Sequence, residues 1–247
     1  MNRFLILTGC LAALLLSSAD GRPPKIILDH ADTLRSQGDV RHLIGNVRIR
    51  QGTTKIQAER AYHNSRTGLV DFMGSVVLEE PGRKITAAQM SYYEPTGNFE
   101  AFGNVDFLQS DSVRIRAQTA RYYEDLNRLD LFDQVIINNL SDGASIMGRR
   151  ARWERGQDLA VVEGDPVYRL PDREADPPDT LVIKSQQVTY YKKTRAALFA
   201  GDVDLTRRDL ISVSDTLFYQ PDCNRTILNG APVIWHDRDE LSGRYIE

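Results

Sequence analysis

The chain has 247 residues, of which 41% are hydrophobic and 26% are charged, and its formal net charge is −3 at pH 7. This length accommodates one large domain or two small ones. The slight acidity gives no support for nucleic-acid binding, which a basic surface would favour. Of the two cysteines, only Cys223 lies outside the N-terminal apolar segment, so no disulfide within a mature chain is expected.

Residues 1–19 have the outline of a secretory signal peptide. Arg3 precedes an apolar run from Phe4 to Leu16, which is too short to span a bilayer, and small residues end at Ala19. The four residues ending at Cys10 match a lipoprotein processing box. The apolar run continues past Cys10, however, so we favour cleavage after Ala19 over lipidation of Cys10. Because the signal carries one charge, Arg3, the mature chain of residues 20–247 has a formal charge of −4.

A unit of about 30 residues recurs along the remainder of the chain. Its clearest copy runs from Gly74 through Tyr92 to Val105, and it reads as strands separated by turns. A period of this size indicates an array of one supersecondary unit. Aligned on the valine of a Gly-x-Val motif, about seven copies begin at Val47, Val76, Val105, Val135, Val167, Val203 and Val233.

The apolar residues of each unit follow the two-residue period of a strand that is buried on one face. The valine and the residue two positions later share that face, and the next strand begins with isoleucine and a small residue. A change of parity after the small residue predicts a bulge in this second strand. We therefore predict an all-β single domain of about fourteen antiparallel strands. The residues expected to line one continuous apolar interior are Val47, Ile49, Ile56, Ala58, Val76, Leu78, Ile85, Val105, Phe107, Ile115, Val135, Ile137, Val203, Leu205 and Ile211.

Three parts of the chain depart from the repeat. Asp133 replaces the motif glycine in one copy, and the valines at 167 and 233 follow Gly-x-Pro, which we interpret as one added residue. Residues 170–179 are polar and proline-rich, and we expect an exposed loop there.

The array begins and ends in mid-unit. We expect the segments Ile26–Asp32 and Leu241–Tyr245 to form unpaired edge strands that can pair with other proteins. The residues placed at these edges are Ile26, Ile27, Leu28, Leu241 and Tyr245.

No catalytic or metal-binding motif stands out. The four histidines are scattered over different units, and none has metal-ligand spacing to another histidine or cysteine. Asp202-x-Asp204 and Asp237-x-Asp239-Glu240 lack the remaining ligands of a calcium loop. We therefore expect neither an enzyme nor a bound metal or cofactor.

The pattern resembles the OstA-like family, the periplasmic bridge proteins of lipopolysaccharide transport. The resemblance rests on Leu43–Ile49, on Ile56–Tyr62 and on their sister copies, and it covers about residues 26–245. It implies a twisted β-jellyroll in the periplasm, open at one side, whose apolar groove holds the acyl chains of lipopolysaccharide or a related glycolipid. It also implies edge-to-edge pairing with other jellyroll transport components, or head to tail with a second copy.

The residues themselves leave other functions open. A core filled by its own side chains satisfies the same pattern, as in a structural or adhesive repeat protein that binds no ligand. If the interior is instead an open groove, burying one lipid tail of about twelve carbons would contribute roughly 10 kcal/mol to the binding free energy, before ordering costs. A polysaccharide lyase on a β-solenoid needs like charges on successive coils, whereas Arg48, Asp106 and Asp204 differ in sign.

Overall fold

The computed structural model describes residues 26–109, 112–157, 159–172, 178–191, 193–194, 196–220, 223 and 225–247. The expected signal peptide and Cys10 lie outside these residues. The described residues form twenty β-strands and a short 3-10 helix, Arg155–Gln157, which confirms the all-β prediction. No helix in these stretches is long and apolar enough to cross a membrane.

The chain divides into two compact units, with the division after Leu131. The expectation of a single domain from residue 20 to residue 247 stays a prediction. The strands of the N-terminal unit are β1 (Ile26–His30), β2 (Thr33–Gln37), β3 (Val40–Gln51), β4 (Thr54–Asn64), β5 (Leu69–Glu80), β6 (Arg83–Tyr93), β7 (Asn98–Gln109), β8 (Val113–Tyr123) and the start of β9 (Arg128–Asn139).

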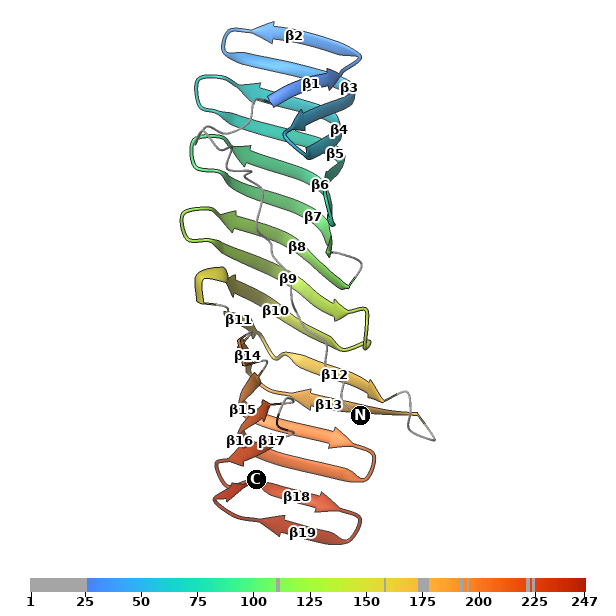
Figure 1. The fold of residues 1–247 in the computed structure, drawn as a ribbon, viewed down its shortest axis with the longest axis vertical. Coiled ribbons are helices and arrows are strands. Elements are labelled where there is room, and N and C mark those ends of the chain that lie inside the picture. The colour runs from blue at the N-terminus through green and yellow to red at the C-terminus, as the bar shows by residue number, and fades with distance from the viewer. Residues whose placement is uncertain are drawn as a thin grey trace. The chain divides into compact units, whose positions relative to one another are not determined.

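The long strands of the N-terminal unit form antiparallel hairpins, and each pair changes register near its middle. We call this point the corner, and the two sets of strand segments on either side of it wall A and wall B. Wall A contains β1 and residues 47–51, 54–58, 76–80, 83–87, 105–109 and 113–117. Wall B contains β2 and residues 40–44, 60–64, 69–73, 89–93, 98–102 and 119–123. The hairpin turns of wall B follow one another along one side of this unit (Figure 1).

The C-terminal unit also has two walls, and at several of its corners the strand is interrupted. Its strands are β10 (Ser145–Glu154), β11 (Leu159–Glu163), β12 (Val167–Asp172), β13 (Asp179–Lys184), β14 (Gln187–Tyr191), β15 (Ala196–Arg207), β16 (Leu210–Gln220), β17 (Arg225–Asn229), β18 (Val233–His236), β19 (Asp239–Ser242) and β20 (Tyr245–Ile246). Wall A runs through β12, β13, β15, β16, β18 and β19, and wall B through β11, β14, β15, β16, β17 and β20.

Each corner is made by two successive residues with left-handed backbone angles. Gly74 and Ser75 have φ of +81° and +47°, and the Gly-x pairs of the sister strands repeat these values closely. The pair adds one residue to its strand, because Met73 pairs with Gln89 while Val76 pairs with Ala87. The extra residue therefore lies in the first strand of the unit and not in the second, where it was predicted. The predicted change of parity in the second strand is present, since Ala87 and Met90 are both buried. Asp133 keeps φ at +60° without glycine, which an aspartate tolerates better than most residues.

The Gly-x-Pro copies correct the repeat alignment. Pro166 and Pro232 are fully buried at the position that valine holds in the other copies, so no residue is added there. Every later position in these strands shifts by one. As a result Tyr168 packs against the core, whereas Trp235, which the valine alignment placed inside, is 36% exposed.

The loop predicted at residues 170–179 is shorter than expected. Strand β12 continues to Asp172 and β13 begins at Asp179, and these two residues pair with each other. Residues 170–172 thus extend a strand where a loop was expected, while 173–177 lie outside the described residues.

Candidate functional site

Apolar side chains of the two walls face each other inside the N-terminal unit. Val76 on wall A and Ala61 and Ala101 on wall B are completely buried. A cavity of about 20 Å³ remains between the walls, roughly the room of one water molecule. An acyl chain does not fit in this cavity unless the side chains that line it move. The residues that line the cavity are Ile85, Phe99, Val105, Phe107, Ile115, Ala117, Ala120, Leu129 and Leu131.

Most of the predicted interior residues are buried. Three of them, Ile56, Ile137 and Leu205, are half-buried. Val135, Ile137, Val203, Leu205 and Ile211 lie in the C-terminal unit, and the others lie in the N-terminal unit. The buried ones are Val47, Ile49, Ala58, Val76, Leu78, Ile85, Val105, Phe107, Ile115, Val135 and Val203.

Ile211 does not face the interior, and its prediction is wrong. Its side chain is 43% exposed, on the outer face with Trp235, its partner across β16 and β18. The inner positions of this strand are Ser212 and Ser214, which pair with Leu205 and Val203. In sister strands such as β6 and β8 an isoleucine holds the corresponding inward position, but here Ser212 holds it.

The interior of the C-terminal unit is a hydrophobic core around Phe199, Val203 and Leu217. The ring of Tyr168 packs against it, with its centroid 5.8 Å from that of Phe199. Burial raises the pKa of Tyr168 far above its usual value, and the nearby Asp142 adds to the effect. This phenol therefore stays neutral and adds a hydroxyl beside the hydrophobic core.

Polar residues continue the inner face of wall A at its hairpin ends in the N-terminal unit. We call Thr54, Glu80, Arg83 and Gln109 the polar lip. Thr54 Oγ1 donates a hydrogen bond of 2.7 Å to Glu80 Oε1, and Arg83 Nη1 lies 3.6 Å from Glu80 Oε2. The side chain of Glu80 is only 5% exposed, and this burial raises its pKa although Thr54 and Arg83 oppose the shift. Sequence reasoning missed these residues, but the alternation Val76, Leu78, Glu80 contained the signal.

Aromatic residues occupy the corresponding ends of wall B. We call Tyr92, Phe99 and Tyr122 the aromatic lip. The rings of Tyr122 and Phe99 stack at 5.7 Å, and the Tyr122 hydroxyl lies 3.3 Å from Asn127 Oδ1. Burial raises the pKa of Tyr92, and the carboxylates of Glu94 and Glu124 add to this. Such rings suit the boundary between an apolar interior and water, because one end is apolar and the other is polar.

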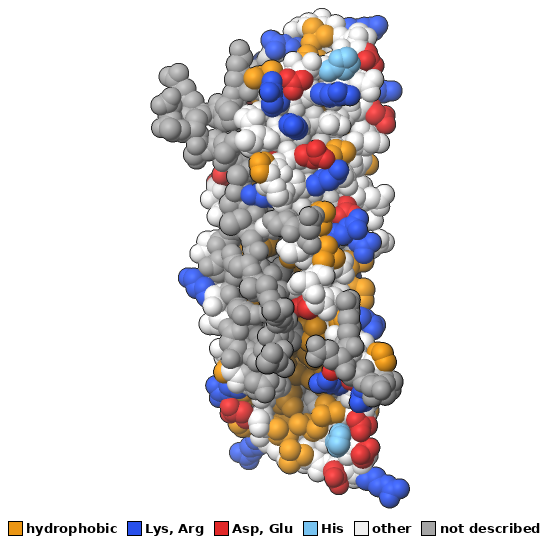
Figure 2. Space-filling view, turned by 45° about the vertical axis from the view of Figure 1, so that its right-hand side comes forward, with side chains coloured by type: hydrophobic (Ala, Val, Ile, Leu, Met, Phe, Trp, Pro, Cys, Tyr) orange, Lys and Arg blue, Asp and Glu red, His pale blue; other side chains and the backbone are white. Residues whose placement is uncertain are grey.

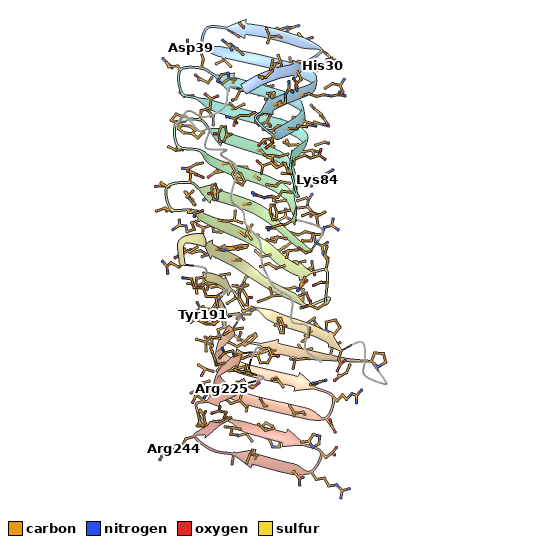
Figure 3. The ribbon with its side chains drawn as sticks, in the orientation of Figure 1. His30, Asp39, Lys84, Tyr191, Arg225 and Arg244 are labelled. Carbon is orange, nitrogen blue, oxygen red and sulfur yellow. The ribbon has the colours of Figure 1, made fainter. Side chains whose placement is uncertain are left out.

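Each unit has strands that are paired on one side only among the described residues. In the N-terminal unit β1 and β2 both pair with β3, and in the C-terminal unit β19 pairs with β18 and β20 with β17. The predicted segment Ile26–Asp32 contains β1 and ends just before β2, whereas Leu241–Tyr245 contains the end of β19 and the start of β20. Of the predicted edge residues, Ile26 is half-buried and the exposed ones are Ile27, Leu28, Leu241 and Tyr245. Arg225, placed in Figure 3, holds β20 to β17 through a hydrogen bond of 2.6 Å from its Nε to Glu247.

One group of possible metal ligands occurs among the described residues. Ligand atoms of Asp209, His236 and Asp237 lie within 4.8 Å of one another, and all three residues are exposed. His236 Nε2 is 3.4 Å from Asp209 Oδ2, which an exposed ion pair explains without a metal. On the face drawn in Figure 2, acidic and basic side chains are mixed, and hydrophobic side chains gather in the lower part of the view.

Bent antiparallel strands whose two halves enclose an apolar interior define a β-jellyroll built from repeated hairpins. The sequence model of the family described as OstA-like protein matches residues 71–210, more than half of the chain, and this protein belongs to that family.

Among solved structures, the chain is similar to LptH from Pseudomonas aeruginosa, described as the LptA-homologous periplasmic component of the conserved lipopolysaccharide transport device. The two share 10% sequence identity with a TM-score of 0.42, over 48% of this chain and 82% of that one. No curated protein matches the sequence.

Proposed function

We propose that this protein transports an acylated glycolipid of the lipopolysaccharide type through the periplasm, and that the acyl chains lie between walls A and B. The observation that carries the proposal is an apolar interior bounded by a polar lip and an aromatic lip. An amphipathic ligand matches this order of surfaces, because its tails prefer the interior and its head group prefers the lips. Membership of the OstA-like family supports the same function, and we assign the protein no catalytic role.

In this proposal the walls move apart as the lipid enters. Each methylene that leaves water contributes on the order of 0.8 kcal/mol, so a long tail can offset the separation of packed side chains. Residues at the corners act as the fixed end of this movement, and the lips are the ends that part.

We also propose that the open edges join this protein to other jellyroll components of a bridge between the inner and outer membranes. An edge strand offers backbone N–H and C=O groups in the spacing that another strand needs. A second copy of this chain is one such partner.

Photo-crosslinking tests the lipid site. A crosslinking amino acid at Ile56, Leu78 or Phe107 should capture glycolipid in cells, because these side chains face the interior. The matched control is Arg48, which lies between Val47 and Ile49 but points outward. Capture at Arg48 and not at the inward positions would contradict the assignment.

The alternative is a structural or adhesive protein with a dry core, which the complete burial of Val76, Ala61 and Ala101 also fits. Native mass spectrometry of the purified protein separates the two functions. A transport protein should carry glycolipid from its source, and a dry core should carry none.

A further inference from the structure

The polar lip contains a charged pair in a position that burial normally disfavours. Arg83 and Glu80 are the residues on either side of the β5–β6 turn, and both lie on the inner face with Ile85 and Leu78. Their side chains are 14% and 5% exposed. Removing two charges from water costs several kcal/mol per ion unless direct hydrogen bonds replace the water.

The hydrogen bonding within this pair is incomplete. The distance of 3.6 Å from Arg83 Nη1 to Glu80 exceeds the 2.7–2.9 Å of a direct charge-assisted hydrogen bond. Thr54 instead donates to the other carboxylate oxygen at 2.7 Å. Glu80 is thus fixed from the neighbouring hairpin, and the guanidinium lies beside it without a direct bond to it.

We propose that Arg83 binds the phosphate group of a lipid whose acyl chains lie behind it in the N-terminal unit. This inference rests on the proposed function. A guanidinium fork matches two phosphate oxygens at once, and a partly dehydrated site strengthens the attraction. Arg83 occupies the inner-face position between the hydrophobic residues and the hairpin end of wall A. The phosphate at the head of a lipid with an inserted tail therefore contacts Arg83 first.

Two other cationic residues are less suited to phosphate binding. Lys84 points away from the interior, as Figure 3 shows, and its Nζ lies 2.9 Å from Glu79. In the C-terminal unit the inner-face Arg207 already holds two carboxylates, Asp172 at 2.7 Å and Asp179 at 3.2 Å. Those two negative charges would repel a phosphate.

The test compares two lipids that differ only in the phosphate. Binding of dilauroyl phosphatidic acid and of dilauroylglycerol to the full chain is measured, together with inorganic phosphate alone. The wild type should prefer phosphatidic acid. Arg83→Gln should reduce that preference by tenfold or more, because a hydrogen bond to a charged group is lost. Lys84→Gln, the matched control on the outer face, should keep the preference.

Glu80→Gln provides a second measurement. It removes the carboxylate that competes for Arg83 and keeps an acceptor for Thr54, so the preference for phosphatidic acid should increase. Equal loss of both lipids in Arg83→Gln, or an unchanged preference in both variants, would overturn the inference.

The remaining outcomes separate the inference from the proposed function. If the wild type binds both lipids equally, only the role of Arg83 fails. If it binds neither lipid, the lipid-transport function fails with it. If inorganic phosphate binds as tightly as phosphatidic acid, the site takes a free anion and the head-group assignment is wrong.

Discussion

At the scale of single residues, the corner glycines carry two separate requirements. Gly74 has φ of +81°, and a Cβ placed there would lie 2.8 Å from the Cβ of Glu59 on the neighbouring strand. The first requirement is a backbone conformation that most side chains avoid, and the second is space. The same contact recurs at Gly45 against Asp32 and at Gly201 against Gln186.

Gly74→Ala should destabilise the protein by more than the cost of its backbone angle. The matched control is Gly38→Ala, since Gly38 has φ of +57° but nothing within 4 Å of a new Cβ. We expect about 1–2 kcal/mol for Gly38→Ala from the backbone alone. Urea unfolding of both variants measures the difference, and equal losses would show that the contact with Glu59 does not matter.

The stability of the polar lip should depend on pH through Glu80. Because burial holds the pKa of Glu80 above its usual 4.5, the folded chain binds more protons than the unfolded chain just above that pH. The free energy of unfolding should therefore fall as pH rises from about 4.5 through the folded pKa. Glu80→Gln should remove this part of the pH dependence in urea titrations between pH 4 and pH 7. An identical profile in the two proteins would contradict the prediction.

Sequence reasoning located interior residues correctly where a hydrophobic residue occupies an inward-facing position of a strand. It succeeded for the burial of Val76, Leu78 and Phe107 because alternation there is unbroken. It failed at Ile211, because Ser212 holds the inner position and no hydrophobic residue marks it. A prediction based on the periodicity of hydrophobic side chains does not detect buried serines and prolines.

At the scale of elements, the strand count illustrates what a corner does. About fourteen strands were expected, and the described part of the chain contains twenty. Most of the difference arises because long strands break at the corner, as β11 and β12 do at Gly164-Asp165-Pro166. Sequence pattern predicts a continuous strand through such a point, since the hydrophobic period resumes on the other side.

Strand β19 permits a test of edge pairing that leaves its own ladder intact. The N–H of Gly243 donates to the carbonyl of Pro232 at 3.2 Å. In an antiparallel pair these bonds alternate, so the N–H of Ser242 points away from β18 toward the open edge. Ser242→Pro should therefore remove a donor for a partner strand and keep the pairing with β18.

Sedimentation at several protein concentrations and capture of jellyroll partners measure the effect of Ser242→Pro. Ser242→Ala is the control, because it changes the side chain and retains the N–H. Weaker assembly in the proline variant alone supports pairing through β19. Unchanged assembly in both would assign docking to another surface.

At the scale of the whole molecule, the proposed lipid site around Phe107 and the proposed docking strand β19 lie in different units. Phe107 lines the cavity of the N-terminal unit, and β19 lies in the C-terminal unit. Neither substitution site belongs to the contacts that the other is expected to make. The two properties should therefore be separable by mutation.

A charge at Phe107 should abolish lipid capture and leave self-association unchanged, because Phe107→Asp places an unpaired carboxylate in an apolar interior. Ser242→Pro should give the opposite result, with lipid retained and assembly lost. Phe107→Trp guards against simple unfolding, since the larger ring occupies the space that a tail would need.

Transfer of a fluorescent glycolipid from donor to acceptor protein should require both lipid binding and assembly, so a mixture of the two variants should stay inactive. Transfer by Ser242→Pro at the wild-type rate would mean that the lipid moves through solution without a bridge, and the proposed role in an assembled path would then be wrong.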